Sequence, residues 1–285
     1  MEKTVKQNAE SRFQPASRKQ YPAAVFPGET VKDGGTHTGS AGVVQLPLRY
    51  FACRYCELQE ICVNAAKSGN RPSLTRIIEH PRPFHRGDYL FHQGDPVGYF
   101  YIVNSGVTKQ FITTREGAEQ VVNFTLMGEA VSLDYLEGGR HNSNVMALDT
   151  TSVCAIPLSR LNREKDLKTT LAGYLLRFAA MELTRKYELQ QLIGQGSAEN
   201  KLAYFLNDMA ARLEQTGHPR ERVMLPMSRH DIANYLCLAD ETISRLFSKF
   251  SEWKILKVDK KRILITDFET LGAMASNDRA GAPAA

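Results

Sequence analysis

The hydrophobic pattern of the chain changes its period once, and this change most restricts how the chain can fold. From Leu74 to Pro157, short alternations of apolar and polar residues, such as Tyr99–Val103 and Gln120–Phe124, are separated by glycine-containing turns. Strands spaced about every 8–12 residues are typical of an all-β sandwich or barrel. From Asp166 to Ile193 there is no proline, and apolar residues recur at helical spacing. We therefore expect a β-rich domain followed by a long helix.

The predicted helix is longer than a small domain needs for its own core. A helix of about 25 residues spans about 38 Å. It can pack along its own domain or pair with a second copy of the chain, and we favour pairing. The apolar stripe predicted to form the dimerisation surface contains Leu171, Leu175, Phe178, Met181 and Leu189. Charged residues at 182, 185 and 186 interrupt this stripe, so any coiled coil is specified partly by charge.

Shifts in composition mark the other boundaries. The chain has 285 residues, which is enough for two domains of about 100–200 residues each. We expect mobile tails at 1–44 and 276–285, a cysteine loop with the β-rich domain at 45–165, and the long helix at 166–194. A separate α-rich module with a short β wing is expected at 197–275.

The composition indicates a cytoplasmic protein. No apolar run approaches the length of about 18 residues that a membrane span requires. Residues 1–19 are polar and charged, without the apolar segment of a signal peptide. In a reducing cytoplasm, the five cysteines are expected to serve metal or redox chemistry rather than disulfides. The net charge of +5 permits a polyanionic partner without establishing one.

Residues 227–250 have the pattern of two short helices joined by a tight turn. Ser228 is a good N-cap, and Asp231 favours the positive end of the first helix. The turn at 237–239 leads to a second helix with apolar residues on its inward side, Ile243, Leu246, Phe247 and Phe250. This pattern is typical of a helix-turn-helix, whose second helix presents polar side chains to the major groove. On spacing alone, a helical hairpin with a solvated charged face is the alternative.

The polar face of the second helix carries the chemistry of base readout. Arg245 can donate two hydrogen bonds to guanine, Glu241 can accept one from the cytosine amine, and Ser244 can bond to several bases. Phosphate contacts supply affinity without sequence preference. The basic residues predicted to make them are Lys249, Lys257, Lys260, Lys261 and Arg262.

Four of the cysteines have a spacing that suits a metal cluster. Cys53, Cys56 and Cys62 lie in one short segment, and Cys154 follows much later in a strand-like stretch. Four thiolates are the ligands that a [4Fe–4S] cluster requires. A closed tetrahedral zinc site accepts the same four ligands, and thiols without a metal are a third possibility.

Two stretches of the chain resemble the Crp/Fnr superfamily of transcription regulators. They are the run from Asp231 to Leu236 followed by Glu241–Arg245, and the glycine-punctuated segment from Gly87 to Gly106. The resemblance covers roughly residues 50–275. It implies an α+β fold: an N-terminal β-roll similar to a cyclic-nucleotide-binding jelly roll, a long dimerisation helix and a C-terminal winged helix-turn-helix. It also implies a homodimer that binds palindromic promoter DNA and contacts RNA polymerase.

The resemblance extends to the Fnr-like, oxygen-sensing branch of the superfamily. The Cys-x2-Cys-x5-Cys segment and the isolated Cys154 are similar to the cluster ligands of that branch. This implies a [4Fe–4S] cluster on Cys53, Cys56, Cys62 and Cys154 that promotes dimerisation until oxygen dismantles it. Glu241, Ser244 and Arg245 match the DNA-reading positions of that branch, which implies binding to a DNA site resembling TTGAT-N4-ATCAA. The resemblance also implies control of anaerobic or microaerobic gene expression.

The chain departs from that branch at two places in the helix-turn-helix. Ala239 and Asp240 stand where Fnr-like members usually have Thr and Val. Asp240 could replace the lost cap, while the outermost bases of the half-site are left undetermined. Cys237 is either a small buried apolar side chain or a second redox switch.

Other function classes find less support. Arg140 lacks the neighbouring hydroxyl residue of a cyclic-nucleotide cassette. The sequence contains no phosphate-binding glycine loop, nucleophile elbow or recognisable pair of catalytic carboxylates, so it indicates a regulator and not an enzyme. The rival readings are a regulator gated by thiol oxidation or another small ligand and, more remotely, a zinc or iron–sulfur enzyme.

Overall fold

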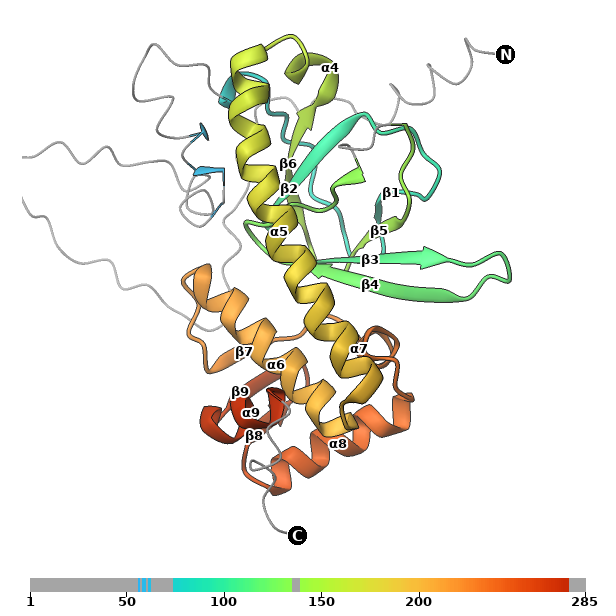
Figure 1. The fold of residues 1–285 in the computed structure, drawn as a ribbon, viewed down its shortest axis with the longest axis vertical. Helices are drawn as coiled ribbons and strands as arrows, with labels where there is room; N and C mark the ends of the chain where they lie inside the picture. Colours follow the sequence, from blue (N-terminus) through green and yellow to red (C-terminus); the bar gives the residue numbers. More distant parts are fainter. Residues whose placement is uncertain (1–55, 57, 60, 63–73, 135–138, 277–285) are drawn as a thin grey trace, which may run out of the picture.

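The computed structural model describes residues 56, 58, 59, 61, 62, 74–134 and 139–276 (Figure 1). The predicted tail at 1–44, all but Ser276 of the tail predicted at 276–285, and the predicted ligand Cys53 lie outside these residues. The described residues form a β-rich N-terminal domain, a long helix and a helix-rich C-terminal domain. The predicted fold class is therefore confirmed.

The N-terminal domain is an antiparallel β-roll. Its strands are β1 (Tyr89–Phe91), β2 (Tyr99–Ser105), β3 (Thr108–Thr113), β4 (Glu119–Thr125), β5 (Asn144–Ala147) and β6 (Ser152–Pro157). One sheet has the order β1-β5-β3-β4, and β2 pairs with β6 in a second. Strand β2 is buried on both faces: Phe100 and Ile102 pack in the cluster that contains residues of the long helix, and Tyr101 and Val103 pack in a second cluster within the roll.

The turn between β2 and β3 requires a glycine. Gly106 has φ of 85°, in the left-handed region that glycine adopts most readily. A Cβ at this position would lie 2.5 Å from the carbonyl oxygen of Thr150 and 2.5 Å from Thr151 Oγ1. The close approach of the 150–151 backbone to this turn brings the end of β2 beside the start of β6.

The helical region is continuous over more residues than predicted. The short elements η4 (Leu74–Arg76) and α4 (Leu158–Leu161) precede α5 (Lys165–Gln195). Helix α5 has 31 residues and is about 46 Å long. Gly196 follows it, and Ser197 caps α6 (Ala198–Gln215) by accepting a hydrogen bond from the amide of Asn200.

The C-terminal domain is a winged helix-turn-helix. Helices α7 (Arg229–Leu236) and α8 (Asp240–Glu252) form the motif. The wing strands β8 (Leu256–Asp259) and β9 (Arg262–Ile265) match the predicted wing, and β7 (Arg222–Met224) adds a third strand in the order β7-β9-β8. Strand β7 and helix α9 (Phe268–Ala275) were not predicted.

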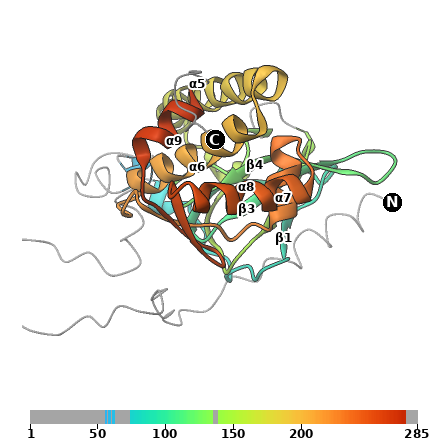
Figure 2. The same cartoon turned by 90° about the horizontal axis from the view of Figure 1, so that it is seen from below.

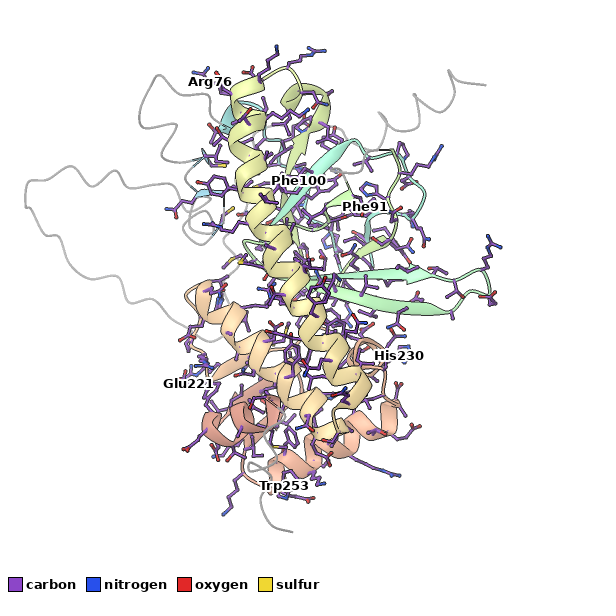
Figure 3. The ribbon with its side chains drawn as sticks, viewed as in Figure 1. Arg76, Phe91, Phe100, Glu221, His230 and Trp253 are labelled. Atoms are coloured by element: carbon purple, nitrogen blue, oxygen red, sulfur yellow. The ribbon has the colours of Figure 1, made fainter. Side chains whose placement is uncertain are left out.

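The two domains share one core. Helix α5 runs along the roll and reaches the C-terminal domain (Figures 1 and 2). Phe111, Val121 and Phe124 of the roll belong to the same buried cluster as Phe205 of α6 and Phe250 of α8. A separate cluster contains Phe100, which lies beside α5 in the roll (Figure 3).

Candidate DNA-binding surface and cysteine site

Helix α7 is fixed at both ends by its sequence. Ser228 Oγ accepts a hydrogen bond from the Asp231 amide at 3.0 Å, and Asp231 Oδ2 accepts one from the Ser228 amide at 2.9 Å. This capping box satisfies two of the free donors at the start of the helix. At the other end Cys237 adopts a left-handed φ of 53° and is exposed. The reading of Cys237 as a buried apolar side chain is therefore wrong.

Helix α8 has the two faces that the sequence predicts. Ile243, Leu246, Phe247 and Phe250 are buried. Glu241, Ser244 and Arg245 are all exposed on the opposite side. The three predicted readout residues therefore share one solvent-facing surface on the second helix of the motif.

One expectation for α8 is not met, namely that Asp240 caps the helix. The N-cap is Ala239, which makes no side-chain cap, and the Asp240 carboxylate points to His230 Nδ1 at 3.0 Å instead of capping the helix. Lys249 lies one turn beyond Arg245 on α8, and its side chain is 44% exposed, so its contact with a phosphate stays a prediction. Its ammonium group is 2.8 Å from Glu199 Oε1 and 4.6 Å from the centre of the Trp253 ring, so it ties α8 to α6.

The wing carries the other predicted phosphate contacts. Lys257, Lys260, Lys261 and Arg262 are all exposed on β8, β9 and the turn between them. Lys260 takes a left-handed φ of 54° in this turn. Lys261 Nζ also donates to the Pro226 carbonyl oxygen at 3.1 Å.

The hairpin formed by β3 and β4 binds α7 through hydrogen bonds. Lys109 Nζ donates to Asp231 Oδ1 at 2.9 Å and to Glu119 Oε2 at 3.3 Å. Burial alone would raise the pKa of Asp231, but its hydrogen bonds from Ser228 and Lys109 outweigh burial and hold the pKa below the ordinary value. The carboxylate that caps α7 therefore also binds the roll.

Asn234 makes a second contact between α7 and this hairpin. Its Oδ1 accepts from the Val121 amide at 2.6 Å, and its Nδ2 donates to the Glu119 carbonyl at 2.7 Å. Gln120 Nε2 in turn donates to the Asn234 carbonyl at 3.0 Å. One asparagine thus pairs with the backbone of β4 in the manner of an added strand residue.

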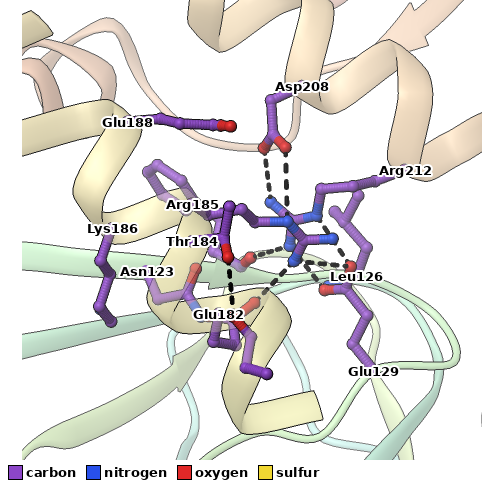
Figure 4. Close-up of polar contacts among 12 residues, drawn as sticks. Asn123, Leu126, Glu129, Glu182, Thr184, Arg185, Lys186, Glu188, Asp208 and Arg212 are labelled. Carbon is purple, nitrogen blue, oxygen red and sulfur yellow. Dashed lines mark hydrogen bonds and ion pairs between the residues drawn. The ribbon is translucent and has the colours of Figure 1, made fainter. Parts of the chain in front are cut away.

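A buried ion-pair network joins the roll, α5 and α6 (Figure 4). Arg212 Nη2 lies 2.6 Å from Glu129 Oε2, and its Nη1 lies 3.1 Å from Asp208 Oδ2. Arg185 Nη1 bonds to Glu182 Oε1 at 2.6 Å. Burial would raise the pKa of Glu129, but Arg212 outweighs burial and holds the pKa below its ordinary value. No local sequence pattern predicts this network, because its partners come from three separate elements.

The described cysteines of the predicted cluster site lie in one apolar environment. Cys62 is buried, Cys56 and Cys154 are partly buried, and all three pack in the same cluster of side chains. Cys154 Sγ is also 4.0 Å from His80 Nδ1. Within the part of the chain that the structure describes, no three His, Cys, Asp or Glu side chains are grouped as a metal site. The fourth predicted ligand, Cys53, lies outside that part.

Helix α5 presents two apolar faces, and the sequence identified the inner one. Leu171, Leu175 and Phe178 are only 0%, 2% and 5% exposed because they pack against the roll in the cluster that contains the cysteines. Leu189 is partly buried against the C-terminal domain, and Met181 is 36% exposed. Three of the five predicted dimerisation residues are therefore buried inside the subunit and do not lie on the surface that could pair with a second copy. This corrects the predicted dimerisation stripe.

The outer face of α5 is apolar as well. Leu176, Leu183 and Tyr187 are 74%, 48% and 62% exposed, and the exposed Ala172 and Ala180 complete the row. Residues spaced by three and four positions lie on one side of a helix. We call the row of Ala172, Leu176, Ala180, Leu183 and Tyr187 the outer stripe.

Among the described helices, none is long and apolar enough to cross a membrane.

Comparisons with known proteins agree with this architecture. Residues 81–165 match the cyclic nucleotide-binding domain family, and residues 200–274 match the Crp-like helix-turn-helix domain family. The structure of FixK2 from Bradyrhizobium japonicum is similar with a TM-score of 0.63 and 26% identity, covering 73% of this chain and 100% of that one.

Curated relatives are similar over most of their length. The transcriptional activator protein anr of Pseudomonas aeruginosa is 34% identical over 230 residues, which are 80% of this chain and 94% of the relative. The fumarate and nitrate reduction regulatory protein of Salmonella typhimurium is 32% identical over 228 residues, which are 80% and 91% of the two chains. These relatives are transcription regulators and not enzymes, as the sequence predicts for this chain. The chain belongs to the Crp/Fnr family of DNA-binding transcription regulators.

Proposed function

We propose that the protein is an oxygen-responsive transcription regulator of the cytoplasm that acts as a homodimer. Its pairing and its binding to a palindrome resembling TTGAT-N4-ATCAA would require an intact [4Fe–4S] cluster, so that it controls anaerobic or microaerobic gene expression. One observation carries the proposal: Cys56, Cys62 and Cys154 pack in the same apolar cluster as the inner face of the long helix α5.

The four predicted cysteine ligands suit a [4Fe–4S] cluster. Cys53, Cys56, Cys62 and Cys154 would hold it, because a [4Fe–4S] cluster takes four thiolate ligands. When bound, such a cluster supplies a redox-active, oxygen-labile centre. The apolar side chains around the three described cysteines, among them Leu58, Ile61 and Ile156, limit the access of water to this region.

The inner face of α5 is the route by which this site would affect the rest of the molecule. Leu171, Leu175 and Phe178 pack in the cluster that holds the cysteines. A shift of the cysteine segment therefore changes the packing that sets the position of α5. Further along α5, Glu182 and Arg185 belong to the ion-pair network with α6. The position of the helix thus affects both the outer stripe and the C-terminal domain.

The outer stripe is the surface on which a second copy would pair. It places apolar side chains in solvent along several turns of one helix, and two such stripes can bury each other. Pairing would bring two copies of α8 to adjacent half-sites of a palindrome. Because the dimer couples the two half-sites, a modest loss of dimer stability lowers occupancy sharply.

Contact with RNA polymerase is the step by which binding would alter transcription. This contact is supported by the similarity to relatives that are named transcriptional activators. The exposed residues of the roll offer the surface for such a contact, and the outcome at each promoter would depend on the position of its site.

An absorption spectrum of the protein purified without oxygen tests the proposal. A broad band near about 420 nm, typical of a [4Fe–4S] cluster, should bleach in air together with loss of binding to the palindrome. Zinc would give no such band. A colourless anaerobic protein that still binds DNA would overturn the oxygen-sensing mechanism and leave a regulator gated by thiols or by another ligand.

A further inference from the structure

An exposed ion pair joins the two helices of the helix-turn-helix. His230 of α7 places Nδ1 3.0 Å from Asp240 Oδ2 and 3.2 Å from Oδ1. Both side chains are open to solvent, at 67% and 51% exposure. An exposed pair of this kind contributes little to the stability of the fold.

Asp240 lies on the same surface as the predicted readout residues. It is the first residue of α8, and Ser244 Oγ donates to its carbonyl oxygen at 3.0 Å from one turn further along. Glu241 and Arg245 are exposed on the neighbouring rows. In helix-turn-helix complexes the N-terminal residues of the second helix approach the base edges, and Asp240 begins that helix.

A carboxylate in this place has a definite chemistry toward DNA. It is repelled by phosphates and by the acceptor atoms of guanine and thymine, but it accepts a hydrogen bond from the cytosine N4 amine. The His230 ring holds the carboxylate in one orientation and, when protonated, offsets its charge. The other lone pairs of the two oxygens face solvent and are available to a base.

We propose that Asp240 reads a cytosine in each half-site and that His230 is its positioning residue. The proposal deepens the proposed function, because it rests on readout of DNA by α8. A regulator with an apolar side chain at the first position of α8 lacks this readout. The half-site of this protein therefore differs from the half-site of such a regulator at one base pair. Glu241, Ser244 and Arg245 read other base pairs.

The test is a panel of duplexes in which each base pair of one half-site is changed to the other three. Binding of the full-length anaerobic protein to each duplex is measured by fluorescence anisotropy. Besides any cytosine that Glu241 reads, wild type should prefer cytosine at one further position by about ten-fold. Asp240→Ala should reduce that preference below about two-fold and leave the preferences at other positions unchanged.

Two further variants separate readout from helix stability. An aspartate at the start of a helix also favours the helix dipole, so Asp240→Ala can lower Tm without any role in readout. Glu252→Gln removes an exposed carboxylate from the far end of α8 and should keep every preference. His230→Ala should weaken the cytosine preference, and His230→Gln, which can still donate to Asp240, should restore it.

The outcomes are distinct. A wild-type protein that binds all duplexes equally overturns readout by α8, and with it both proposals. If Asp240→Ala binds the palindrome with the cytosine preference intact, or changes only Tm, the assignment of Asp240 is wrong and the proposed function stands. Equal behaviour of His230→Ala and His230→Gln overturns the positioning role of the ring.

Discussion

Lys109 Nζ lies 2.9 Å from Asp231 Oδ1, and this contact joins strand β3 of the roll to the first turn of α7. The two side chains are only 9% and 10% exposed. Asp231 is also the capping residue of α7, so one carboxylate serves the helix and the domain interface. The contact fixes the helix-turn-helix relative to the roll without covering the exposed surface of α8.

Replacing Lys109 by Met should destabilise the protein by about 3 kcal/mol, because it leaves Asp231 buried without its cation. Urea unfolding monitored by circular dichroism measures the effect. Lys257→Met, which removes an exposed lysine of the wing, should cost less than about 0.5 kcal/mol. The double variant Lys109→Met/Asp231→Asn should recover part of the loss. Equal stability of Lys109→Met and Lys257→Met would contradict a contribution from the ion pair.

Stability should fall in acid through the same contact. Because Lys109 and Ser228 lower the pKa of Asp231 in the folded state, the unfolded chain binds its proton more readily. Asp231 therefore contributes its whole stabilisation to the free energy of unfolding above its pKa in the unfolded chain, near 3.8. This stabilisation is lost as the pH falls through the lower pKa of the folded state. Glu129 acts in the same direction. The free energy of unfolding measured from pH 7 to pH 3 should decrease less steeply for Lys109→Met than for wild type, and parallel curves would count against this linkage.

Arg212 should matter more than any exposed arginine. Its side chain is 3% exposed and pairs with Glu129 and Asp208. Arg212→Met leaves two largely buried carboxylates, 13% and 17% exposed, with less compensation and should cost about 3–5 kcal/mol. Arg160→Met removes the exposed pair with Glu79, where the two side chains are 54% and 33% exposed, and should cost about 0–1 kcal/mol. Thermal unfolding of both variants decides between these values.

Cys154 should be required for the absorption band and Cys237 should not. Cys154 packs in the apolar cluster with Cys56 and Cys62, whereas Cys237 is exposed in the helix-turn-helix corner. Anaerobic Cys154→Ala should lack the band near about 420 nm and bind the palindrome weakly. Cys237→Ala should keep both the band and the binding. If loss of peroxide sensitivity accompanies Cys237→Ala, this thiol is a second redox switch; unchanged sensitivity would exclude that role.

Leu183→Glu should convert the anaerobic dimer to a monomer. The side chain is 48% exposed in the middle of the outer stripe, where a charge would be buried on pairing. Ile112→Glu changes an apolar residue of similar exposure, 39%, in the roll and is the matched control. Sedimentation of the two variants without oxygen compares their masses. A Leu183→Glu dimer would place the interface elsewhere.

Local features of the structure could be predicted from the sequence. Ser228 caps a helix where a capping residue was expected, and the two faces of α8 follow from its apolar spacing. Local chemistry decides these features, since a cap or a helix face depends on residues a few positions apart. Strand β7 was missed because three residues give too little periodicity.

The contacts between domains could not be predicted in this way. Lys109 and Asp231 are 122 residues apart, and Arg212 and Glu129 are 83 apart. No local pattern pairs them. For α5, periodicity identified an apolar face correctly but not what covers it: Leu171 and Leu175 pack on the roll, while Leu176 and Leu183 remain exposed. Two apolar faces on one helix have different partners, and only the fold separates them.

The contact of Asn234 with β4 also protects the sheet. Strand β4 is the last strand in the order β1-β5-β3-β4, so one side of its backbone has no neighbouring strand in that sheet. Open edges of this kind can pair with a strand of another molecule and start aggregation. Asn234 uses the amide of Val121 and the carbonyl of Glu119 on this edge. Docking of the DNA-binding domain therefore makes the roll resistant to edge-to-edge association, and a protein with its domains undocked would be the aggregation-prone form.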